Sequence, residues 1–139
     1  VYRSTDNGAN WSQVNNGLGV NQSVRALTVN GTTLFAATET NGVFRSTDNG
    51  VNWTQVNNGL GNLFVYSLLS YNSTVYAGTY LGGVYRSSNN GTTWTAYNEG
   101  LEVQQGFVTA YVLSFAVIGN NLFFGGLGPQ GAVYVRRLQ

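Results

Sequence analysis

The sequence has no histidine, cysteine, methionine or lysine among its 139 residues. Without histidine and cysteine the chain has no Ser-His-Asp or Cys-His catalytic arrangement, no disulfide, and no imidazole or thiolate ligand for a metal. Without lysine it lacks Schiff-base chemistry and the usual cation of a phosphate-binding P-loop. These absences exclude several large classes of enzyme, and we expect neither a cofactor nor a metal.

Charge is also scarce, because 8% of the residues are charged and the net charge is +1. So small and dispersed a charge creates no field that attracts nucleic acid or an anionic membrane. No apolar run approaches the roughly 20 residues of a membrane span, so we expect no such span. By contrast, 42% of the residues are hydrophobic and 14% are aromatic, which favours a folded core over disorder.

What the sequence does have is repetition. The segment from Tyr2 to Trp11 returns almost unchanged from Phe44 to Trp53, and a third copy runs from Tyr85 to Trp94. The tryptophans recur at intervals of 42 and 41 residues. After each copy comes a second shared block of four apolar or small residues, at positions 34–37, 75–78 and 122–125. Self-similarity at a fixed period of this length is typical of propellers and related repeat folds.

Each period contains four short runs of strand-forming residues separated by turn residues, which in the second unit cover 24–29, 33–38, 42–46 and 52–56. No segment shows helical periodicity. A unit of ~40–45 residues with four antiparallel strands is typical of a propeller blade. We therefore predict an all-β fold, a β-propeller segment of about three four-stranded antiparallel blades that occupies 1–139 as one domain. The expected units are about 1–18 (partial), 19–60, 61–101 and 102–139 (partial).

The pattern Ser-x-Asp-x-Gly-x-x-Trp in each copy resembles the Asp-box, the bacterial neuraminidase repeat (BNR) of one group of β-propellers. The first two copies match fully, and the third has Asn89 in place of the aspartate. The resemblance implies a structural hairpin in which the tryptophan pins the turn and the aspartate holds it. It assigns this role to Ser4, Asp6, Gly8, Trp11, Ser46, Asp48, Gly50, Trp53, Ser87, Asn89, Gly91 and Trp94. We call the three segments Ser4–Trp11, Ser46–Trp53 and Ser87–Trp94 the box turns.

The expected strands do not close a ring, since known propellers have about 4–8 blades. They amount to half a blade, two whole blades and three strands of a further blade. Two interpretations remain: the chain is the carboxy-terminal part of a longer propeller, or copies of it assemble into a homo-oligomeric ring. Arg136 and Arg137 stand where the next box turn is expected to begin, which is typical of the end of a repeat array. The expected partners are therefore the remaining blades or further copies of the chain.

Catalysis finds little support in the residues. The family that the chain resembles includes sialidases, which hold the substrate carboxylate with three arginines. Arg3, Arg45 and Arg86 occupy one equivalent position in three repeats, so they cannot converge on one anion. The glutamates offer no evident pair of carboxyls flanking a glycosidic bond. We predict a protein that is not an enzyme, with the carboxy-terminal part of a sialidase-like or other glycoside hydrolase as the alternative.

A binding site is expected where the repeats become irregular. In a four-stranded meander, the connections between blades and between second and third strands emerge on the side opposite the box turns. Both connections are longer in the last unit than in the earlier ones. The residues in or beside them with side chains suited to a sugar ring or an extended peptide are Phe64, Tyr66, Tyr80, Glu102, Gln104, Phe107 and Tyr111. The alternative is that these side chains fill the central axis of the propeller or pack against further blades.

The sequence as a whole favours a non-catalytic extracellular propeller module for recognition or structural assembly, with a protein or carbohydrate partner. The resembled family also contains sortilin-like sorting receptors and photosystem assembly factors, so a scaffold of the latter type is a further alternative. High asparagine, threonine and glycine content without lysine or cysteine is typical of secreted bacterial surface proteins. We therefore expect an extracellular or cell-surface location in a bacterium.

Overall fold

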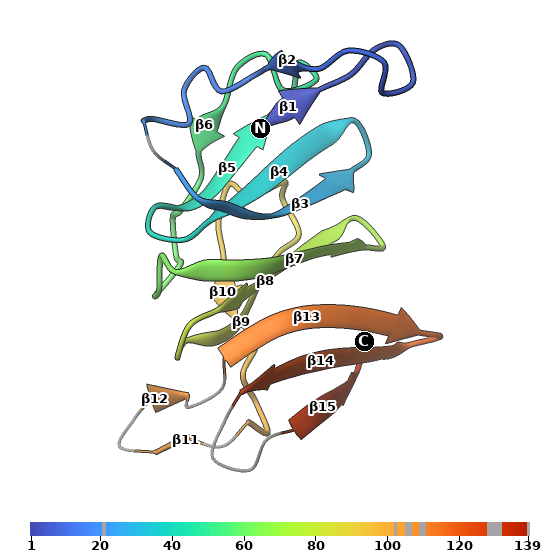
Figure 1. The fold of residues 1–139 in the computed structure, drawn as a ribbon. Coiled ribbons are helices and arrows are strands. Elements are labelled where there is room, and N and C mark those ends of the chain that lie inside the picture. Colours follow the sequence, from blue (N-terminus) through green and yellow to red (C-terminus); the bar gives the residue numbers. More distant parts are fainter. Residues whose placement is uncertain (21, 102, 105–106, 109–110, 128–131, 139) are drawn as a thin grey trace.

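The structure, a computed structural model, describes residues 1–20, 22–101, 103–104, 107–108, 111–127 and 132–138. The regular elements in these residues are all β-strands (Figure 1). In chain order they are β1 (Tyr2–Arg3), β2 (Ser12–Gln13), β3 (Val24–Asn30), β4 (Thr33–Thr38), β5 (Gly42–Ser46), β6 (Thr54–Gln55), β7 (Val65–Tyr71), β8 (Thr74–Thr79), β9 (Gly83–Ser87), β10 (Thr95–Ala96), β11 (Val103–Gln104), β12 (Phe107–Val108), β13 (Tyr111–Ile118), β14 (Asn121–Leu127) and β15 (Ala132–Arg137).

The strands form antiparallel sheets that stack face to face (Figure 1). We call β3–β6 the first blade, β7–β10 the second blade, β13–β15 the third blade, and the pair β1–β2 the half-blade. In the two complete blades the strand order follows the chain order, as in a meander. The first strands lie next to one another, since β3 contacts β7 and β7 contacts β13. The predicted all-β fold with four-stranded antiparallel sheets is confirmed.

The strands of the first blade begin and end close to the predicted positions, with one informative exception. The fourth strand, predicted over 52–56, is reduced to β6 (Thr54–Gln55). The amide of Asn52 instead donates to Asp48 Oδ1 at 2.9 Å, within the box turn. The amide of Trp53 donates across the blade boundary to the carbonyl of Asn16 at 2.8 Å. Both amides are therefore unavailable to the ladder between β5 and β6.

A second difference lies in the long connection between the second and third blades, for which no strand was predicted. This connection contains a short antiparallel pair, β11 and β12, in which Val103 is opposite Val108 and Gln104 is opposite Phe107. In Figure 1 the pair lies at the same left-hand edge as the β4–β5 and β8–β9 connections. The described residues of this connection thus pair with each other, which satisfies backbone groups that a direct turn would not contain.

The hydrophobic core lies between blades. One cluster joins Phe35 and Val43 of the first blade to Val75 and Trp94 of the second. A second cluster joins Tyr76, Val84 and Tyr97 of the second blade to Val112, Leu122 and Phe124 of the third. Because each sheet buries its faces against its neighbours, a blade depends on the adjoining blades for most of its stability.

The three box turns share one hydrogen-bond arrangement, which does not depend on the aspartate being ionised. In each turn the serine hydroxyl donates to Asp6, Asp48 or Asn89 at 2.8 to 2.9 Å. The same hydroxyl accepts the amide of Gly8, Gly50 or Gly91 at 2.8 to 2.9 Å. Hydrogen bonds from Asn10 and Asn52 lower the pKa of Asp6 and Asp48 to about 2. In the third turn the side-chain amide of Asn89 (Nδ2) donates to Thr93 Oγ1 at 2.8 Å, where the aspartates accept a hydrogen bond from asparagine.

Each buried tryptophan ties its blade to the preceding one. Trp53 Nε1 donates to the carbonyl of Val14 at 2.9 Å, and Trp94 Nε1 donates to the carbonyl of Val56 at 2.7 Å. Trp53 is 4% exposed and Trp94 is 3% exposed. Trp11 occupies the same repeat position but is 62% exposed, and its Nε1 donates within its own turn to Gly8. Trp53 and Trp94 therefore each link two neighbouring blades.

At the boundary of the second and third blades, an arginine rather than a tryptophan donates hydrogen bonds to carbonyls of the preceding blade. Arg136 pairs with Leu122 as Ser46 pairs with Leu34, so it occupies the position of the box serine. Its Nη1 donates to the carbonyls of Tyr97 at 3.3 Å and Glu99 at 3.1 Å. These carbonyls are the repeat equivalents of those of Val56 and Asn58, which accept the two N–H groups of Trp94.

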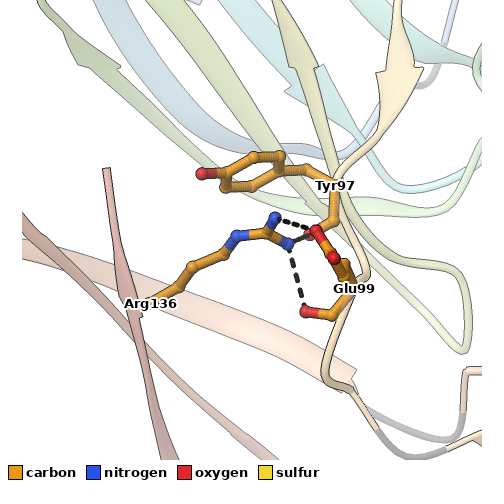
Figure 2. Close-up of polar contacts among 3 residues, drawn as sticks. All are labelled: Tyr97, Glu99 and Arg136. Atoms are coloured by element: carbon orange, nitrogen blue, oxygen red, sulfur yellow. Dashed lines mark hydrogen bonds and ion pairs between the residues drawn. The ribbon is translucent and has the colours of Figure 1, made fainter. Parts of the chain in front are cut away.

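Arg136 therefore makes the contacts that the box tryptophan makes at the other boundary, and its guanidinium has two further contacts. Its Cζ lies 3.7 Å from the centroid of the Tyr97 ring, and its Nη2 lies 2.9 Å from Glu99 Oε2 (Figure 2). A planar guanidinium supplies several donors and also stacks on an aromatic face, so one side chain satisfies both carbonyls and covers the ring. The third blade is thus fastened to the second without a box turn.

Candidate functional site

A β-bulge near the start of the first strand of each blade interrupts the register. The bulges fall between Val24 and Ala26, between Val65 and Ser67, and between Val112 and Ser114. The extra residues are Arg25, Tyr66 and Leu113, so this repeat position carries a different residue type in each blade. A bulge re-aims the side chain of its extra residue and is frequent beside functional sites. The bulges lie at the ends of β3, β7 and β13 that are opposite the box turns.

Four of the predicted binding residues lie together at this end of the molecule. The ring centroid of Tyr80 is 5.9 Å from that of Phe64, 6.3 Å from that of Tyr66 and 4.6 Å from that of Tyr111. The Tyr80–Tyr111 pair meets edge to face, the arrangement that aromatic quadrupoles favour. A hydrogen bond with the Tyr80 side chain raises the pKa of Tyr111. We call Phe64, Tyr66, Tyr80 and Tyr111 the aromatic cluster.

An ion pair from the first blade borders the aromatic cluster. Arg25 Nη2 lies 2.7 Å from Glu39 Oε2, and the Arg25 guanidinium carbon lies 5.6 Å from the centroid of the Tyr66 ring. The hydrogen bond from Arg25 lowers the pKa of Glu39. Glu39 follows β4 and Tyr80 follows the equivalent strand β8. The same repeat position therefore carries a carboxylate in the first blade and an aromatic ring in the second. The site therefore combines aromatic faces with one paired cation and anion.

Asn62 holds two members of the aromatic cluster in place. Its side-chain amide donates to the carbonyl of Tyr80, and its Oδ1 accepts the amide of Phe64 at 2.8 Å. The amide of Tyr80 donates to the carbonyl of Phe64 at 2.9 Å, which closes the arrangement. Phe64 nevertheless remains 45% exposed. The cluster is thus fixed by backbone hydrogen bonds while part of its aromatic surface faces solvent.

The remaining predicted residues are only partly visible. Gln104 lies in β11 and Phe107 in β12, but their side chains are outside the described part of the chain, and Glu102 is outside the described residues altogether. Sequence reasoning did not include Arg25 and Glu39 in the site. The signal that identifies them is the divergence of the repeats at the two positions, Arg25 against Tyr66 and Glu39 against Tyr80.

The carboxylates of the described residues all have partners. Asp6 and Asp48 are held in the box turns, Glu39 is paired with Arg25, and Glu99 is paired with Arg136. Across the described ranges no three acidic side chains gather as metal ligands would. These ranges also form no helix with the length and hydrophobicity needed to cross a bilayer. The described residues of the site offer aromatic faces for stacking and polar groups for hydrogen bonding.

Comparison with known proteins identifies the fold. The sequence model of the DUF6242 beta propeller domain matches residues 1–110. No curated protein matches the chain. A GH74 enzyme of Niastella koreensis superposes with a TM-score of 0.69 and 23% identity, over 98% of this chain and 24% of its own.

Two further structures show the same likeness. The extracellular domain of a hybrid two component system from B. thetaiotaomicron has a TM-score of 0.64 and 21% identity, over 86% of this chain and 15% of its own. The GH74 xyloglucanase of Xanthomonas campestris has a TM-score of 0.59 and 18% identity, over 82% of this chain and 20% of its own. At such identities the likeness shows the propeller fold alone. This chain spans a quarter or less of each of these three proteins.

Proposed function

The chain belongs to the DUF6242 beta propeller domain family, and we propose that it is a non-catalytic recognition module that binds carbohydrate at the aromatic cluster. The observation that carries the proposal is the convergence of Tyr66 and Tyr80 of the second blade with Tyr111 of the third, next to the Arg25–Glu39 pair of the first blade. Aromatic faces bind the apolar face of a sugar ring, and tyrosine hydroxyls and a fixed ion pair supply hydrogen bonds to its hydroxyl groups.

The state of the carboxylates supports binding over hydrolysis. A glycosidase needs one carboxyl group that donates a proton and a second that attacks or activates water. Glu39 is held as an anion by Arg25, and both box aspartates have a pKa of about 2. None of these three groups is therefore suited to act as a general acid near neutral pH.

The cellular location of the protein and the type of its repeat belong to the same proposal. We propose an extracellular location in a bacterium, which the composition and the likeness to a bacterial extracellular domain support. We also propose that the box turns are Asp-boxes. The hydrogen bonds shared by the three turns, including the one with Asn89, support this assignment.

The proposal predicts that the chain binds oligosaccharides on a glycan array and that Tyr80→Ala weakens this binding about tenfold or more, because Tyr80 contacts three other rings. Isothermal titration with the best array ligand measures the change. Trp11→Ala is the matched control, since it removes an exposed aromatic ring on the opposite side and should leave the affinity unchanged. Equal losses in both variants, or no binding on the array, would contradict the proposal. Turnover of a fluorogenic glycoside by the chain would favour the hydrolase alternative.

A further inference from the structure

The first and second blades carry different side chains at two equivalent positions. One position is the extra residue of the bulge, and the other directly follows the second strand of the blade. In the first blade these positions hold Arg25 and Glu39, and in the second blade they hold Tyr66 and Tyr80. The strands β3 and β7 lie side by side (Figure 1), and the Arg25 guanidinium carbon is 5.6 Å from the centroid of the Tyr66 ring. An ion pair and an aromatic pair are therefore adjacent.

The ion pair is fixed in place but remains accessible to a ligand. Arg25 Nη2 lies 2.7 Å from Glu39 Oε2, and the Arg25 side chain is 43% exposed while that of Glu39 is 34% exposed. The amide of Glu39 donates to the carbonyl of Ser23 at 3.0 Å, which holds the backbone at this position. A guanidinium has several N–H donors and a carboxylate has several lone pairs, so both groups keep hydrogen-bonding capacity beyond their own contact.

The hydroxyl groups of a sugar match this ion pair chemically. A hydroxyl group donates its proton to a carboxylate oxygen such as that of Glu39, and its oxygen accepts an N–H of a guanidinium such as that of Arg25. An ionised carboxylate only accepts hydrogen bonds and an ammonium group only donates them. The pair is therefore complementary to uncharged groups that donate and accept at once.

The charge of Glu39 also acts against an acidic sugar. The charges of Arg25 and Glu39 cancel, so the pair offers no net attraction to an anion. A ligand carboxylate that approached Arg25 would come close to the carboxylate of Glu39, and like charges repel. The hydrogen bond from Arg25 lowers the pKa of Glu39, so Glu39 is ionised at neutral pH and this repulsion is present there. Discrimination between ligands commonly depends on such a repulsive group.

We propose, on the basis of the saccharide-binding function proposed above, that the site takes an uncharged oligosaccharide across two blades and that Glu39 determines this specificity. One sugar unit stacks on the aromatic cluster, and hydroxyl groups of the adjoining unit bind the Arg25–Glu39 pair. The smallest ligand that fills both places is a disaccharide. A sugar with a carboxylate at the second place is rejected.

The experiment compares the unmodified chain with Glu39→Gln on a glycan array that carries neutral oligosaccharides, uronic acid oligosaccharides and the monosaccharides of both. We expect the unmodified chain to prefer neutral oligosaccharides and to bind their monosaccharides at least about tenfold more weakly, since one of the two places is then empty. Glu39→Gln removes the carboxylate and leaves Arg25 unpaired. Isothermal titration should then show about tenfold weaker binding of the best neutral ligand and about tenfold tighter binding of the best uronic acid ligand.

Salt and a matched variant separate this role from a structural one. Binding of the uronic acid ligand to Glu39→Gln should weaken as the salt concentration is raised, whereas binding of the neutral ligand to the unmodified chain should change little. Glu99→Gln makes the same change at a glutamate that pairs with Arg136 outside the site. It should keep the affinity and the preference of the unmodified chain.

Three results would overturn this inference and leave the saccharide-binding function in place. The first is a preference of the unmodified chain for uronic acid ligands, and the second is an unchanged affinity of Glu39→Gln for the neutral ligand that Tyr80→Ala weakens. The third is a monosaccharide that binds as tightly as its oligosaccharide. If neither chain binds any ligand on the array, the saccharide-binding function and this inference are both wrong.

Discussion

Trp94→Ala is expected to lower the free energy of unfolding by about 3–5 kcal/mol, the usual cost of truncating a buried tryptophan. The indole lies in the core between the first and second blades, where it packs with Phe35 and Val75. Its Nε1 also donates to the carbonyl of Val56 at 2.7 Å. Removal of the side chain leaves a cavity and a buried carbonyl without its donor, so the two costs add.

Trp11→Ala is the matched control, because it makes the same chemical change at the same repeat position. Trp11 is 62% exposed and bonds only within its own turn, so its loss should cost less than about 1 kcal/mol. Urea unfolding of both variants, followed by far-ultraviolet circular dichroism, provides the comparison. Equal stability of the two variants would show that Trp94 does not stabilise the boundary between the first and second blades.

Gly59→Ala is the second substitution for which we expect a large loss, about 2–5 kcal/mol. Gly59 has a φ of +88°, and a Cβ placed on it would lie 2.1 Å from the carbonyl oxygen of Trp94. The left-handed conformation costs roughly 1–2 kcal/mol for an L-residue, and relief of a backbone clash adds about 1–3 kcal/mol. The clash also displaces the Trp94 backbone, whose amide donates to the carbonyl of Asn58 at 2.8 Å.

Gly100→Ala separates the two costs of this substitution. Gly100 is the repeat equivalent of Gly59 and has a φ of +82°, but among the residues that the structure describes no atom of a residue beyond its chain neighbours lies within 4 Å of the position of its Cβ. It should therefore carry the conformational cost alone, about 1–2 kcal/mol. Thermal unfolding of the two variants measures the difference. A Gly100→Ala variant as unstable as Gly59→Ala would show that the close approach between blades does not exist.

Much of the fold could be predicted because the same pattern of strand and turn residues recurs in three copies of the repeat. A strand such as β4 (Thr33–Thr38) has a repeated apolar block, turn residues on both sides and an equivalent in every blade. The shortening of β6 could not be predicted from local pattern. It depends on the amide of Trp53 bonding to Asn16, a residue of the half-blade that is far away in sequence.

Arg136 shows why other features could not be predicted. In the sequence it marks only the place where a box turn is expected and does not occur. Its contacts with Tyr97 and Glu99 depend on how the third blade faces the second. The pair β11–β12 was missed for a related reason, since its strands are only two residues long and have no equivalent among the described residues of the other repeats.

The candidate site could be predicted in part. The lengths of the connections identified the side of the molecule, and aromatic composition identified Phe64, Tyr66, Tyr80 and Tyr111, which the structure brings together. Arg25 joins them because a bulge re-aims its side chain towards Tyr66. A bulge depends on pairing between strands, and the sequence of β3 alone does not reveal it.

Exchange of the three indole N–H protons with deuterium, followed by NMR on the unmodified chain, tests the stacking of the blades most directly. Trp53 and Trp94 donate to carbonyls of the preceding blade and are almost completely buried, whereas Trp11 is exposed. We predict rapid exchange of the Trp11 proton and slow exchange of the other two, at rates close to those of the core amides. Three equal, rapid rates would show that no tryptophan lies between blades, and the account of the fold would then be wrong.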